Sequence, residues 1–114
     1  MFRHTQTSLL GTSSATAALT ATAGGTKAAA LALTSSVNQV SVCASLNDSV
    51  LLPPAKSGVS CLVRNDGAQT LAVYGAGTDT INTASTATAF AVAAGKTAIF
   101  AAYADGAWCA VLSA

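Results

Sequence analysis

The sequence predicts an all-β domain, an antiparallel β-sandwich or jelly roll preceded by an irregular N-terminal arm. Short runs of alternating apolar and polar residues are typical of strands with one buried face. Turn sequences separate these runs at close intervals, as at Asn65-Asp66-Gly67 and Asp105-Gly106. The runs amount to about seven or eight short strands, the number that a sandwich or a jelly roll requires.

Residues 1–26 differ from the rest of the chain. Residues 12–26 consist of Thr, Ser, Ala and Gly with a single Leu, so they carry little apolar surface to offset the entropy lost on ordering. An Ala-rich helix is the alternative, but the hydroxyl residues lower helix propensity and Gly24-Gly25 would end the helix. We therefore expect an extended arm over residues 1–26 and a β-sandwich domain over residues 27–114.

The first half of this domain contains three expected strands. Residues 28–33 form the first, and residues 37–43 form the second, in which Val40 and Val42 fall on one face. Residues 50–52 form a short third strand. It ends at Pro53-Pro54, because proline donates no hydrogen bond to a sheet.

The second half is more regular. Residues 59–64 alternate clearly, and Asn65-Asp66-Gly67 supplies the positive φ angles of a tight hairpin that returns through residues 69–74. A glycine-rich loop that carries Ile81 then leads to a strand over residues 86–92. The last two strands, residues 96–103 and 107–112, are joined by Asp105-Gly106, a pair typical of type I′ turns.

The larger apolar residues that alternate inward are expected to form one core. This predicted core comprises Val40, Val42, Leu51, Val59, Cys61, Val63, Leu71, Val73, Ile81, Phe90, Val92, Ile99, Trp108 and Leu112.

Composition limits the kinds of partner. Only 8% of residues are charged and the mean hydropathy is +0.55, so either an uncharged polar surface keeps the chain in solution or other chains cover much of it; we favour the second. The net charge is +1 and the basic residues are scattered, which argues against nucleic acid as a partner. No apolar segment is long enough to cross a membrane, and no export signal is evident.

The sequence offers no catalytic, metal or cofactor site. Its one histidine, His4, lies in the arm, so the Ser and Thr hydroxyls lack a base and a metal lacks clustered ligands. Gly95-Lys96-Thr97 and Gly75-Ala76-Gly77 match only parts of phosphate- and dinucleotide-binding motifs, and no helix is expected after either. Cys43, Cys61 and Cys109 are expected to be reduced core residues. We therefore predict that the chain is not an enzyme and binds no cofactor.

From Asn65 to Ala114 the order of strands and turns resembles small virion structural proteins of tailed bacteriophages. The resemblance is carried by the Asn-Asp-Gly-Ala turn, by residues 71–82 and 92–100, and by Gly106-Ala107-Trp108. It implies a capsid decoration (cement) or head-fibre protein that is made in the host bacterial cytoplasm and carried on the virion surface. Its partner would be the major capsid protein, and its function would be to stabilise contacts between capsid subunits. A receptor- or carbohydrate-binding fibre module, with Tyr74, Tyr103 and Trp108 as a sugar platform, is the alternative.

The shortage of charge also predicts the surfaces used. We expect a homotrimer whose apolar seam lies near the C-terminus, with Ile99, Phe100, Tyr103 and Trp108 divided between core and seam. The large side chains of the arm are expected to order against the shell or a neighbouring subunit: Phe2, Arg3, Leu9 and Leu10.

Overall fold

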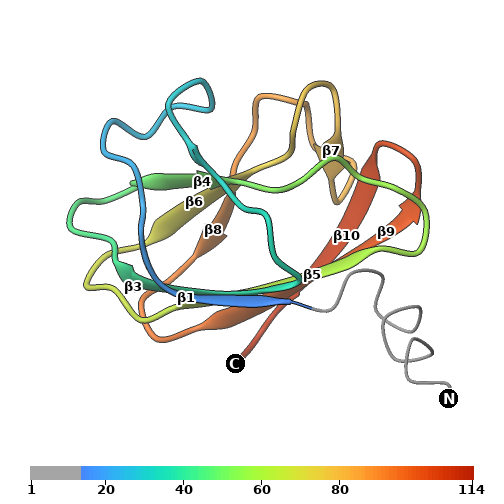
Figure 1. Ribbon diagram of the computed structural model, residues 1–114. Helices are drawn as coiled ribbons and strands as arrows, with labels where there is room; N and C mark the ends of the chain where they lie inside the picture. The colour runs from blue at the N-terminus through green and yellow to red at the C-terminus, as the bar shows by residue number, and fades with distance from the viewer. Residues whose placement is uncertain (1–13) are drawn as a thin grey trace, which may run out of the picture.

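The computed structural model describes residues 14–114, and every regular element in this part of the chain is a β-strand (Figure 1). The strands form a six-stranded sheet of order β1-β3-β5-β9-β10-β7 and a four-stranded sheet of order β2-β4-β6-β8. The all-β prediction is confirmed. The strands are β1 (Ala15–Thr20), β2 (Leu31–Ala32), β3 (Val37–Val42), β4 (Ser49–Leu51), β5 (Ser60–Asn65), β6 (Leu71–Tyr74), β7 (Thr80–Ile81), β8 (Phe90–Val92), β9 (Thr97–Ala104) and β10 (Ala107–Leu112).

Strand direction differs from the predicted antiparallel arrangement. In the first two thirds of the domain the chain passes alternately between the sheets, so β1, β3 and β5 are parallel neighbours and so are β2, β4 and β6. This is a β-solenoid-like arrangement, in which each circuit of the chain stacks on the preceding one. Antiparallel pairing occurs between β5 and β9, β9 and β10, and β6 and β8, while β7 runs parallel to β10.

The turn at Asn65 explains why β5 and β6 do not form the predicted hairpin. The buried Asn65 side chain accepts a hydrogen bond from Gly67 N (2.9 Å) and donates to the carbonyl oxygens of Gln69 and Val92 (2.8 Å each). These bonds guide the chain from one sheet into the other. Gly67 does not have a positive φ angle; it is required because a Cβ atom there would lie 2.4 Å from the backbone nitrogen of Cys43.

Part of the predicted arm belongs to the β domain. β1 pairs with β3, Ala21 is buried in the core, and Thr22 forms a β-bridge with Ser49. A low-complexity segment is ordered here because the rest of the domain supplies its hydrogen-bond partners. The remainder of the arm, residues 1–13, lies outside the described residues.

Two other expected strands are shorter than predicted, and one turn is of a different type. The strand expected over residues 28–33 is limited to β2, and the one expected over residues 86–92 is limited to β8. Asp105-Gly106 does join β9 to β10. Only Gly106 has a positive φ there (79°), whereas a type I′ turn needs two such residues.

The core draws on both sheets, with side chains of β3, β5, β9 and β10 packed with those of β4, β6 and β8. Most of its predicted members are buried, and Leu51, Val59 and Phe90 are partly buried. Val42, Ile99 and Leu112 are exposed instead, by 43%, 47% and 43%. At Val42 the alternation ends and the next residue, Cys43, takes the inward position; Ile99 lies on the outer face of β9, and Leu112 is the last residue of β10.

Candidate interaction surface

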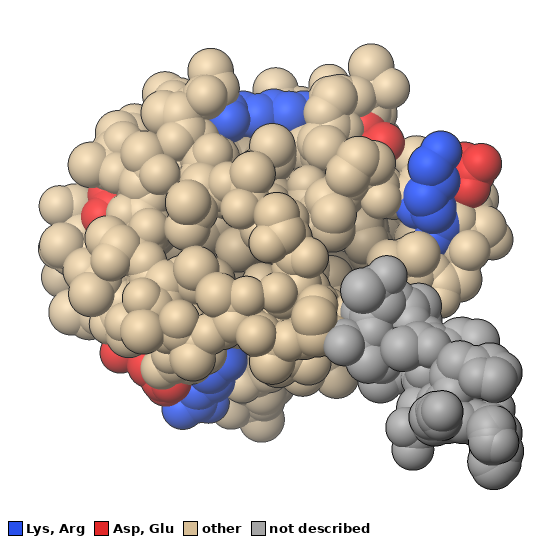
Figure 2. All heavy atoms as spheres, viewed as in Figure 1, with Lys and Arg blue, Asp and Glu red and all other residues tan. Residues whose placement is uncertain are grey.

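Broad areas of the surface carry no charged side chain. In the view of Figure 2, Lys, Arg and Asp side chains lie at the margins and the area between them is uncharged. One face of the six-stranded sheet also points away from the core. In β9, for example, Ala98, Phe100 and Ala102 are buried and the intervening residues point outward. This outer face is the candidate interaction surface.

An apolar row crosses the outer face. Strand register aligns Val37 of β3 with Leu62 of β5, Leu62 with Ile99 of β9, and Ile99 with Val111 of β10. Val37, Ile99 and Val111 are 42%, 47% and 67% exposed, and Leu62 is partly buried. Because neighbouring strands are about 4.8 Å apart, the row is about 15 Å long. We call these four residues the apolar ridge.

A row of small residues runs beside the apolar ridge, two positions along each strand. Register aligns Ser60 of β5 with Ala101 of β9, and Ala101 with Cys109 of β10. Tyr103, which is 58% exposed, points outward two residues beyond Ala101. A cavity of about 250 Å³ opens where the ridge crosses β3 and β5, and of the small-residue row it touches Ser60. It is lined by Ser36, Val37, Ser60, Cys61, Leu62 and Ile99. We call Ser60, Ala101 and Cys109 the small-residue trough.

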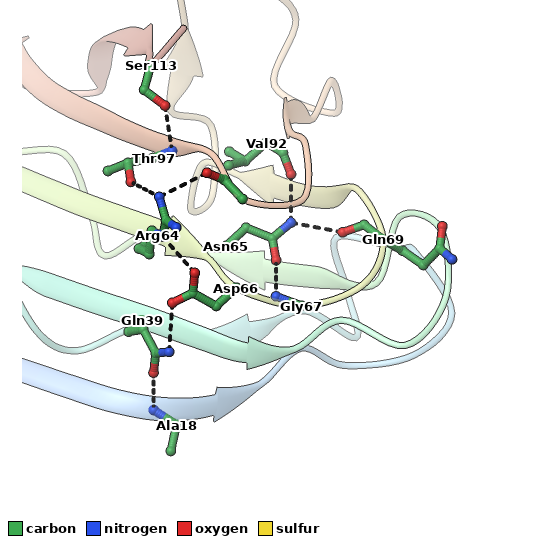
Figure 3. A network of polar contacts seen from close by, with 11 residues as sticks. Ala18, Gln39, Arg64, Asn65, Asp66, Gly67, Gln69, Val92, Thr97 and Ser113 are labelled. Carbon is green, nitrogen blue, oxygen red and sulfur yellow. Dashed lines mark hydrogen bonds and ion pairs between the residues drawn. The ribbon is translucent and has the colours of Figure 1, made fainter.

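A polar network borders the apolar ridge on its other side (Figure 3). Arg64 Nε donates to Asp66 Oδ1 (2.7 Å), and Gln39 Nε2 donates to Asp66 Oδ2 (2.9 Å). Arg64 also donates to the Gly95 carbonyl oxygen, at 2.9 Å. The hydrogen bonds from Gln39 and Arg64 lower the pKa of the Asp66 carboxyl. Arg64 and Asp66 therefore form a paired, electrically neutral edge to the face.

The structure divides the predicted seam residues between core and surface. Phe100 and Trp108 are fully buried, whereas Ile99 and Tyr103 are exposed on the outer face. Phe2, Arg3, Leu9 and Leu10 lie outside the described residues. Sequence reasoning missed Val37, Leu62 and Val111 as surface residues. Alternation in the last strand gave a signal for Val111, but only the register shows that the ridge residues lie side by side.

The aromatic residues considered for sugar binding do not form a platform. Tyr74 is 9% exposed, and its hydroxyl donates to the carbonyl oxygen of Gly25 (2.8 Å). Trp108 is fully buried. Tyr103 is therefore the exposed member of the set.

The cysteines differ from the prediction in one position. All three are free, and Cys43 and Cys61 are buried as expected, but Cys109 is exposed because it points outward from β10. Among residues 14–114, no group of three or more His, Cys, Asp or Glu side chains could hold a metal ion. The same part of the chain contains no helix with the length and apolar character needed to cross a membrane.

Burial of the Cys61 thiol makes the stability of the fold depend on pH in the alkaline range. It raises the pKa of the Cys61 thiol from an ordinary value of 9.0 to about 11, despite a hydrogen bond from the Asn38 side chain. The unfolded chain loses this proton first. The stabilisation is therefore complete below about pH 9 and falls by up to about 2.7 kcal/mol as the pH rises through 11.

We expect urea unfolding at about pH 8 and about pH 10.5 to reveal this loss. The Cys61→Ala variant, which has no thiol at this site, should lose less stability between the two conditions than the wild type. Equal losses in the two proteins would contradict the assignment of this effect to Cys61.

Comparison of the chain with protein-family models, curated proteins and solved structures finds no match in any of the three.

Proposed function

We propose that this chain is a bacteriophage capsid decoration (cement) protein. In this proposal it binds the outside of the shell and stabilises contacts between major capsid subunits. The observation that carries the proposal is the wide uncharged surface of the described residues, with Lys, Arg and Asp at its margins in the view of Figure 2. Exposed apolar patches bordered by polar groups are typical of protein-binding surfaces.

The proposed mechanism is burial of uncharged surface at many equivalent sites. Each contact is weak alone, but several copies that bind one shell together gain affinity through their high effective concentration. This mechanism includes no covalent step, so the proposal describes a protein that is not an enzyme and needs no cofactor. Nucleic acid and membrane are not among its proposed partners.

The proposal also covers assembly and location. We propose a homotrimer whose subunits meet through outward residues of the C-terminal strands, with Ile99 and Tyr103 among them. The protein would be made in the host cytoplasm and would end on the virion surface. In finer detail, we propose that the two sheets act as the layers of one sandwich-like module, whose core keeps the outer face flat.

The second candidate function is a receptor- or carbohydrate-binding module of a phage fibre. The exposed Tyr103 favours it, because aromatic rings often form the apolar part of a sugar-binding site. With Tyr74 and Trp108 buried, this candidate depends on one ring, whereas decoration draws on the wide uncharged surface.

Quantitative mass spectrometry of purified virions of the phage that encodes the chain tests both functions. We expect on the order of hundreds of copies per particle, since a shell offers many equivalent sites. A handful of copies would favour a fibre module. Absence from the virions would reject both proposals.

A further inference from the structure

We propose that the outer face of the six-stranded sheet binds a second copy of this chain, with the apolar ridge of one copy packed into the small-residue trough of the next. This inference takes from the proposed function only the expectation that three copies of the chain associate. The contact itself follows from the shape, charge and edges of the sheet.

Shape is the first argument. A surface that binds its own copy must carry both halves of the contact, so that a protrusion on one copy meets a depression on another. Here the two halves lie side by side. Val37, Ile99 and Val111 protrude, while the small side chains of Ala101 and Cys109 leave room two residues along the same strands. A cavity of about 250 Å³ lies beside Ser60, at the β5 end of the trough, and gives an entering aliphatic side chain a place to be buried.

Charge is the second argument. The described outward side chains of β3, β5, β9 and β10 include one charged residue, Arg64, and it is paired with Asp66. A copy of the same face therefore brings no net charge and meets no like-charge repulsion. A strongly charged partner would find no complementary field on the ridge or trough.

The edge strands of the two sheets are poorly suited to self-association. β1 is the long edge strand, but its ladder is irregular: Ala18 has a φ of 61°, and its N–H donates to the Gln39 side chain instead of pointing outward (2.7 Å). The other edge strands, β2, β7 and β8, have two or three residues each. Short and irregular edges disfavour the addition of a strand from another chain. Self-association is therefore expected through the face.

Substitution by lysine or glutamate tests each half of the contact individually. Val111→Lys places a charge on the ridge, and Ala101→Glu places one in the trough, both in the full-length chain. Each should weaken self-association by about 100-fold or more, because the contact would bury an unpaired charge. Leu46→Lys is the matched control: Leu46 is 64% exposed, close to the 67% of Val111, but lies in the loop between β3 and β4. It should change association less than about threefold.

Cys109 provides a reporter within the native chain. It lies in the trough, while the other two cysteines are buried. Its rate of reaction with a maleimide should fall as wild-type protein concentration rises and should stay constant for Val111→Lys. Circular dichroism and the slow reaction of Cys43 and Cys61 verify that each variant is folded.

Sedimentation equilibrium counts the copies. A mass of three chains would support both the ridge-in-trough contact and the proposed homotrimer. A mass of two would retain the contact and overturn the homotrimer. A wild-type monomer at all concentrations, or a folded Ala101→Glu variant that associates like the wild type, would overturn the inference. Neither of these outcomes would alter the virion copy number, so failure here is distinct from failure of the decoration proposal.

Discussion

Replacement of Trp108 by alanine is expected to remove about 3–5 kcal/mol of stability. Trp108 is fully buried in β10, and strand register places it beside Ala102 of β9 and Ile81 of β7. Loss of the indole would leave a cavity where these three strands meet. Because domains of this size are stable by only about 5–15 kcal/mol, this loss would remove a large share of the total stability.

Trp108 is the only tryptophan, so circular dichroism must follow urea unfolding of the variant. The neighbouring Cys109→Ala is the control, because this outward side chain contributes little to the core. It should change stability by less than about 0.5 kcal/mol. A Trp108→Ala protein as stable as Cys109→Ala would show that the indole does not fill the core in solution.

The second large effect is expected at Gly67. An alanine Cβ there would lie 2.4 Å from the Cys43 nitrogen and 2.6 Å from the Cys43 Cβ. Relief of this overlap requires the turn after β5 to move away from the end of β3, which would strain the Asn65 hydrogen bonds. We expect Gly67→Ala to cost several kcal/mol, measured as a lower urea midpoint and a lower melting temperature.

Gly77→Ala distinguishes this overlap from the general cost of replacing glycine. An added Cβ at Gly77 meets no atom within 4 Å, although its φ of 54° is unfavourable for alanine. Its expected cost is about 1–2 kcal/mol. If Gly67→Ala proved no more damaging than Gly77→Ala, the close approach of the two chain segments would be contradicted.

The alternation of apolar and polar residues predicted where the strands lie in the sequence better than it predicted which strands pair with each other. The bounds of β10 agree with the expectation, and those of β3, β5 and β9 agree to within about one residue. Alternation reports which side chains share a face, but it contains no information on which strand lies alongside. Parallel stacking was therefore missed. The Asn65-Asp66-Gly67 sequence likewise fits a hairpin and a crossing between sheets equally well until the contact with Cys43 is known.

The same limit applies to the N-terminal segment and to the interaction surface. β1 consists of Ala, Thr and one Leu, and its order depends on pairing with β3, a contact that local composition does not reveal. The sequence identified Ile99 and Tyr103 as surface candidates from the shortage of charge. It could not align Ile99 with Leu62 and Val37, because that alignment depends on register between distant strands.

The strand order has a consequence for synthesis on the ribosome. β5 takes its second neighbour from β9, and β7 takes its neighbour from β10, so residues 97–112 are inserted between segments made earlier. A nascent chain that has emerged only as far as residue 85 can stack β1, β3 and β5 but leaves one side of β5 open. Such an open side can pair with other chains. The six-stranded sheet is complete only after residues 97–112 have left the exit tunnel, and until then the open side of β5 is available to neighbouring nascent chains.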